Sequence, residues 1–188
     1  TDDHTIKKMS QNYKFEIMKR NTKLAGDLVN SVDVVIDVLK KSLFKYGYLP
    51  KVFFLIQPTS IFLKSVHILK LLKILKKQKF LSAQTIIKVP HQFHAYNQRY
   101  LKKNSQTGFV FEKKRMFMHN KQTKPLFFAY GNLIACKTEK FLKYKNFFVK
   151  PSYGYLIPNI YGFDVDNKFD LKIVKQILNK KITFYEKN

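Results

Sequence analysis

The chain has no tryptophan, only one cysteine (Cys136) and no long apolar run in its 188 residues. A single cysteine excludes an intrachain disulfide and a zinc site built from cysteine ligands. The longest apolar candidate, 52–63, is too short to cross a bilayer and is interrupted by polar residues and a proline at 57–60. We therefore expect no disulfide and no membrane-spanning segment.

Acidic residues are also scarce. Twelve Asp and Glu face 36 Lys and Arg, which gives a net charge of +24. Such an imbalance predicts a polyanionic partner, and nucleic acid is the usual one. The chain also has 18 Phe, 11 Tyr and 45% hydrophobic residues, so it is expected to fold around a core, unlike a disordered basic tail.

The sequence shows no set of catalytic groups. We find no nucleophile beside a base, no paired carboxylates and no glycine-rich phosphate loop. His91 and His94 have a spacing found in metal sites, but no further ligands accompany them. Residues 164–167 lack the glycine and the distal glutamate of a calcium loop, so they predict a turn. We therefore predict no metal, no cofactor and no enzyme.

Hydrophobic periodicity predicts a mixture of strands and helices. Asp27 is the expected N-cap of the clearest helix and Gly47 its stop. The expected elements are a strand at 13–19, a helix at 28–43, a hairpin of strands 52–56 and 61–66, a basic amphipathic helix within 68–80, strand-like pieces at 85–89, 109–117 and 125–135, a helix beginning at Asp170 and a strand at 181–185.

The ends of the chain thus follow the order strand, helix, strand, strand, then helix, strand. This is the split βαβ plan of ferredoxin-like folds. We predict one α+β domain over 1–188, with a βαββαβ core from 13–67 and about 164–186, an extended hairpin, and a long insertion at about 68–163.

Two short motifs carry a resemblance to a known family. Leu49-Pro50-Lys51 follows the first helix, and Leu63-Lys64-Ser65-Val66-His67 ends the expected hairpin. With these motifs, segment 15–67 resembles ribosomal protein S-ten, the tenth protein of the small ribosomal subunit. The expected helix and strand at 170–185 are similar to the last elements of that family.

The resemblance implies a structural constituent of the small ribosomal subunit. Such a protein would lie in the head of the subunit, bind ribosomal RNA and neighbouring head proteins during translation, and not be a homo-oligomer. Lys, Asn, Phe, Ile and Tyr are abundant, as in products of A/T-rich genomes, so we expect a mitochondrial ribosome and an organelle-encoded chain.

Basic and aromatic side chains are the candidate RNA-binding residues. The basic ones either contact phosphates or form a solvated face, and the tyrosines either stack on unpaired bases or pack under their own loop. The candidates are Lys45, Lys51, Lys64, His67, Lys70, Lys73, Lys77, Arg99, Lys102, Lys103, Lys113, Lys114, Arg115, Tyr153 and Tyr155.

Two other functions remain open at this point. Segment 68–80 has Lys on one face and aliphatic residues on the other, so it could lie on an anionic bilayer as part of a membrane complex. The chain could also be a subunit of a nucleic-acid enzyme, which would need a metal-binding carboxylate cluster.

Overall fold

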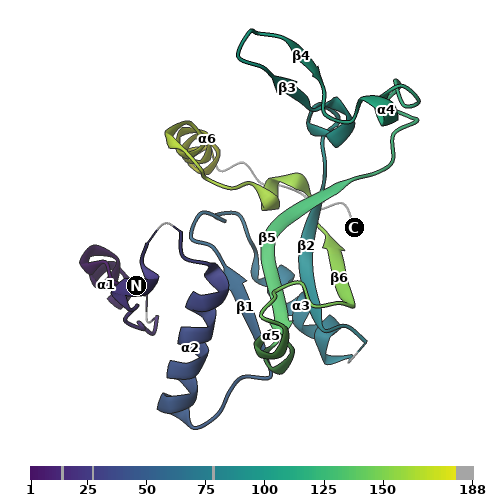
Figure 1. The fold of residues 1–188 in the computed structure, drawn as a ribbon. Coiled ribbons are helices and arrows are strands. Elements are labelled where there is room, and N and C mark those ends of the chain that lie inside the picture. Colours follow the sequence, from purple (N-terminus) through teal and green to yellow (C-terminus); the bar gives the residue numbers. More distant parts are fainter. Residues whose placement is uncertain (14, 27, 78, 181–188) are drawn as a thin grey trace.

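A four-stranded mixed sheet forms the centre of the molecule (Figure 1). The computed structural model describes residues 1–180 except 14, 27 and 78. The strand order is β1-β5-β2-β6, and both β1 and β2 run antiparallel to β5 while β6 runs parallel to β2. The strands are β1 (Val52–Ile56), β2 (Ser82–Lys88), β5 (Phe128–Lys137) and β6 (Ser152–Leu156).

Helices cover both faces of this sheet (Figure 1). On one face, Ile134 and Cys136 of β5 share a core with α2 (Ser31–Tyr46) and α5 (Thr138–Tyr144). On the other, the alternate residues Leu133 and Ala135 pack with α3 (Ser65–Lys76). Because side chains alternate along a strand, a strand covered on both faces is apolar throughout. The α+β class is confirmed.

Helix α2 confirms the clearest sequence prediction. Asn30 is its N-cap, and its side-chain oxygen accepts a hydrogen bond from the Val32 amide at 2.9 Å. Gly47 ends the helix at φ +76°, a conformation that costs glycine little. Asp27, the predicted cap, lies outside the described residues.

The predicted hairpin is wrong, because its second strand does not form. β1 pairs with β5 instead, and α3 begins at Ser65, inside the expected strand. The His67 imidazole Nδ1 accepts a hydrogen bond from the Lys64 amide at 3.2 Å, which stabilises the start of the helix. Leu71 and Leu75 then recur at helical spacing and are buried against the sheet. A ferredoxin-like core is not confirmed.

Two further strand predictions fail. The described residues of 13–19 form no strand; a helix, α1 (His4–Gln11), precedes them, capped by Asp3. Segment 109–117 contributes only Phe109 to a strand before the short helix α4 (Glu112–Arg115). The predicted strand 181–185 lies outside the described residues.

The segment expected as an insertion supplies much of the sheet, since β2, β5 and β6 all lie within 68–163. The last helix, α6 (Lys168–Asn179), begins at a capping box between Asn167 and Asp170. No helix in the described part of the chain is both long and apolar enough to cross a membrane.

An arm extends from one end of the sheet (Figure 1). It follows the turn η2 (His91–Phe93) and contains η3 (Ala95–Asn97), the antiparallel pair β3 (Arg99–Leu101) and β4 (Thr107–Phe109), and α4. We call residues 95–118 the basic arm. It stands on the ends of β2 and β5, the two central strands of the sheet.

Candidate nucleic-acid interface

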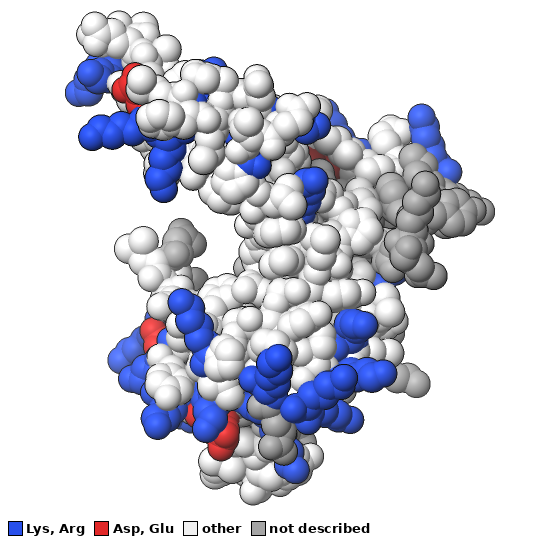
Figure 2. All heavy atoms as spheres, turned by 90° about the vertical axis from the view of Figure 1, so that its right-hand side faces the viewer, with Lys and Arg blue, Asp and Glu red and all other residues white. Residues whose placement is uncertain are grey.

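The predicted RNA-binding residues fall mainly into two groups. Figure 2 shows Lys and Arg gathered toward the two ends of one face, with few between them. One group belongs to α3 and its flanks: Lys64, Lys70, Lys73 and Lys77. The other belongs to the basic arm: Arg99, Lys102, Lys103, Lys113, Lys114 and Arg115.

Two predicted contacts lie outside these groups. Lys45 forms an ion pair with Glu16 at the C-terminal end of α2, so part of its charge is already compensated. Lys51 is exposed immediately before β1.

The aromatic and imidazole candidates next to α3 pack inside the protein. His67 is fully buried and meets the Tyr161 ring edge-on at 5.0 Å. Tyr153 and Tyr155 lie on β6 and pack against the α3 side of the core, where Tyr153 meets Phe80 at 5.1 Å. These three side chains therefore stabilise the α3–sheet contact; His67 is enclosed, whereas Tyr153 and Tyr155 are partly buried.

The α3 lysines border this aromatic cluster. The Lys64 ammonium lies 4.6 Å from the centre of the Tyr161 ring, and the Lys70 ammonium 5.7 Å from that of Tyr155. These cation–π contacts hold the stems of both lysines along the protein surface.

The basic arm combines positive charge with exposed apolar side chains. It has six basic residues and one acidic residue, Glu112. The Arg99 and Arg115 guanidiniums lie 4.5 and 5.0 Å from the centre of the Phe109 ring. Phe117 and Leu101 remain 82% and 77% exposed. This mixture of cations and exposed apolar surface suits phosphates together with unstacked bases.

Glycine at 108 makes this arm compact. Gly108 lies directly opposite Tyr100 in the β3–β4 pair, and a Cβ at 108 would come within 2.4 Å of the Tyr100 hydroxyl oxygen. Tyr100 can therefore cross its partner strand, with the Lys102 ammonium 5.8 Å from its ring centre.

Arg115 ties α4 to the rest of the arm. Its Nη1 donates a hydrogen bond to the Asn97 side-chain oxygen at 3.0 Å and lies 3.4 Å from the His119 carbonyl oxygen. Because these bonds fix its guanidinium, Arg115 positions the arm as well as adding charge.

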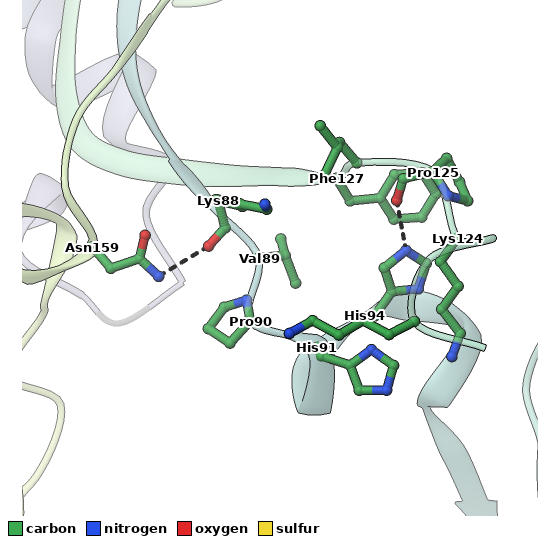
Figure 3. Close-up of a pocket in the computed structure, with 11 residues that line it drawn as sticks. Lys88, Val89, Pro90, His91, His94, Lys124, Pro125, Phe127 and Asn159 are labelled. Carbon is green, nitrogen blue, oxygen red and sulfur yellow. Dashed lines mark hydrogen bonds between the residues drawn. The ribbon is translucent and has the colours of Figure 1, made fainter.

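Sequence reasoning missed a basic pocket at the base of the arm (Figure 3). Its volume is about 370 Å³. Lys88 and His91 reach it from the end of β2, and Lys121 and Lys124 from the segment that leads into β5. The available signal was the histidine pair at 91 and 94 with Lys88 nearby, but Lys121 and Lys124 lie some 30 residues further along the chain.

Positive charge dominates this pocket. Burial lowers the pKa of Lys124 below its usual value, and nearby Arg115 adds to the effect. Burial also lowers the pKa of His91, and the charges of Lys124, Lys121, His94 and Arg115 act in the same direction. The described residues that line the pocket include no Asp or Glu.

His94 is a structural residue of this pocket. Its Nε2 donates to the Pro125 carbonyl oxygen at 3.0 Å, and its Nδ1 accepts from the Tyr96 amide at 3.1 Å. With both ring nitrogens engaged, His94 is unsuited to bind a metal. Within the described ranges, no three His, Cys, Asp or Glu residues gather closely enough to hold a metal ion.

Comparison with known proteins gives a likeness in fold alone. No family model matches the chain, and no curated protein does. The solved structure of CMP:2-keto-3-deoxy-manno-octonic acid synthetase complexed with CTP matches with a TM-score of 0.67 at 11% identity. The match covers 97% of this chain and 80% of the synthetase chain. The chain therefore shares the fold of this synthetase.

This likeness corrects the functional predictions from the sequence. The assignment to the S-ten family is wrong, and with it the role as a structural constituent of a mitochondrial small ribosomal subunit, because the matching structure is a synthetase. The two motifs are short, and one of them spans the start of α3 where the predicted hairpin strand does not form. The prediction that ribosomal RNA and head proteins of the small subunit are partners is therefore no longer supported. The prediction that the chain is not an enzyme is also overturned, since an enzyme has this fold.

Proposed function

We propose that this chain binds single-stranded nucleic acid through the basic arm. One observation supports this most directly: six cations and several exposed aromatic and aliphatic side chains share an element that projects from the sheet. Cations contact the phosphates, and rings such as Phe117 and Tyr100 offer surfaces on which unpaired bases stack.

The fixed positions of several arm cations favour this function over a solvated basic face. Arg99 and Arg115 are held against Phe109, and Arg115 is also hydrogen-bonded to Asn97. Side chains that are already ordered lose less conformational entropy on binding. The α3 lysines extend the positive surface and steer nucleic acid toward the protein.

The test is the salt dependence of binding to a single-stranded RNA oligonucleotide, measured by fluorescence anisotropy. Lys102→Gln with Lys103→Gln removes two exposed cations from the turn between β3 and β4. Losing two phosphate contacts should reduce the slope of log K against log salt by about 1.4 and weaken binding at low salt. Lys8→Gln with Lys40→Gln is the matched control, because it removes the same charge from exposed positions on α1 and α2.

The comparison of the two pairs decides the proposal. We expect a lower slope for the arm pair and little change for the control pair. Equal losses in both would show that binding follows net charge alone, and no measurable binding by the unaltered chain at low salt would refute the function.

A second candidate function is nucleotide binding. It is favoured by the likeness in fold to the synthetase, whose solved structure contains CTP. Calorimetric titration of the chain with CTP, with cytidine as the control, tests it directly.

A further inference from the structure

The pocket at the base of the arm gathers cations from separate parts of the chain. Lys88 is the last residue of β2 and His91 follows the strand (Figure 3), while Lys121 and Lys124 precede β5. Like charges brought together raise one another's electrostatic free energy. In the described part of the chain, Lys88, Lys121 and Lys124 have no carboxylate within ion-pair distance. An anion inside the pocket would relieve this repulsion.

Lys124 is the strongest indication of a ligand. Its residue surface is only 8% exposed, and its ammonium lies 3.5 Å from the His119 carbonyl oxygen, at the limit of a hydrogen bond. A buried ammonium without a counter-ion is costly. The lowered pKa of Lys124 reflects the same cost. A bound anion would supply a compensating negative charge and further acceptor oxygens beside that of His119.

The walls of the pocket are already ordered. The His94 ring is bonded at both nitrogens and stacks on Phe127, with ring centres 4.6 Å apart. The Asn159 side chain donates to the Lys88 carbonyl oxygen at 3.0 Å, which fixes the end of β2 (Figure 3). A site with ordered walls, onto which the exposed Lys88 and Lys121 open, binds a small anion without reorganising the fold.

We propose that this pocket binds a phosphomonoester group. Such a group carries nearly two negative charges at neutral pH and three acceptor oxygens, whereas each backbone phosphodiester carries one charge. Three lysines around one pocket suit the more highly charged group, and the negative charge of that group would favour the protonated form of His91. If the phosphomonoester is the 5′ end of a bound strand, this inference rests on the proposed function and deepens it. A free nucleotide would supply the same chemistry.

Three ligand pairs test the site and distinguish the two possible sources of the phosphate group, an RNA 5′ end and a free nucleotide. The pairs are inorganic phosphate against chloride, 5′-phosphorylated against 5′-hydroxyl RNA of one sequence, and CMP against cytidine. Phosphate should shift the His91 ring signals in NMR spectra and raise the pKa of His91. The phosphorylated member of at least one remaining pair should bind about tenfold or more tightly, as expected for charge-assisted hydrogen bonds.

Two variants assign this gain to the pocket. Lys88→Gln with Lys121→Gln changes two exposed side chains and should abolish the preference for the phosphorylated ligand. Lys124→Met keeps an apolar stem in the buried position and should do the same, with circular dichroism confirming the fold. The Lys8→Gln, Lys40→Gln pair serves as the control and should keep the preference.

The outcomes distinguish this inference from the proposed function. Unchanged His91 signals in phosphate, together with equal affinity within both remaining pairs, would overturn the phosphate site. If the Lys102→Gln, Lys103→Gln pair still weakened RNA binding in that case, the proposed function would stand alone. A preference for CMP without one for 5′-phosphorylated RNA would support the site and show that its ligand is a free nucleotide.

Discussion

The hydroxyl of Thr85 hydrogen-bonds backbone groups at an irregular point of the sheet. Removing this hydroxyl should destabilise the protein measurably. The β2–β5 register shifts between Gln84 and Ile86, so several residues of β5 face Thr85 alone. The buried Thr85 hydroxyl donates to the Gly131 carbonyl oxygen at 2.7 Å and accepts from the Leu133 amide at 3.2 Å. It therefore replaces two bonds of the interrupted ladder.

Thr85→Val keeps the shape of the side chain but leaves both backbone groups buried without this partner. Each unsatisfied group costs about 1–3 kcal/mol, so the free energy of unfolding should fall by about 2–6 kcal/mol. Thr85→Ser is the control, because it keeps the hydroxyl and removes one methyl group, at a cost of about 1 kcal/mol. Tight packing at this point, where a Cβ on Gly131 would lie 2.9 Å from the Thr85 hydroxyl oxygen, leaves little room for relaxation.

Urea denaturation followed by circular dichroism measures the difference. We expect Thr85→Val to have the lower midpoint at an unchanged slope against urea. If the two variants agreed within about 0.5 kcal/mol, the hydroxyl would not satisfy these backbone groups, and this account of the irregular pairing would be refuted.

Two further predictions concern single titrating groups. Burial raises the pKa of Cys136 to about 11, so its thiol should be almost entirely protonated at pH 8. Iodoacetamide at this pH should therefore leave the folded chain unmodified but alkylate Cys136 in the chain unfolded by urea. Rapid alkylation of the folded chain would contradict the buried position. The pKa of His91 is lowered from 6.5, first by burial and then by Lys124, Lys121, His94 and Arg115, so in phosphate-free buffer its NMR titration should have a midpoint below 6.5. Because the unfolded chain then takes up this proton at higher pH than the folded chain, the stability contributed by His91 is complete above pH 6.5 and falls as the pH drops from there toward the folded pKa. A midpoint at or above 6.5 would contradict the positive field at this histidine.

Local patterns predicted some elements well. The apolar stripe of α2 and its terminal glycine give a helix in the expected place, and β1 forms where five apolar residues follow Lys51. The strand prediction for segment 61–66 was wrong because a short apolar run fits a strand or the approach to a helix equally well. Its outcome depends on the His67–Lys64 hydrogen bond and on burial of Leu71 and Leu75 against the sheet.

Part of the candidate site could be predicted from the sequence, and part could not. The basic residues of the arm were identified from the sequence because they are close together along the chain, between 99 and 115. The pocket was not, because Lys88 and Lys124 meet only when β2 and β5 pair, and Lys124 shows its burial only in the folded chain.

By itself the sequence determined the excess of positive charge, the lack of an intrachain disulfide and the amphipathic helices, since each depends on composition or on spacing within a few turns of chain. Only the tertiary structure decided the strand order, the burial of His67 and the meeting of lysines from distant segments. Long-range pairing brings together residues whose separation along the chain carries no local signal. The charge of +24 indicated a polyanion, and the fold decided where an anion would meet several lysines that have no carboxylate partner among the described residues.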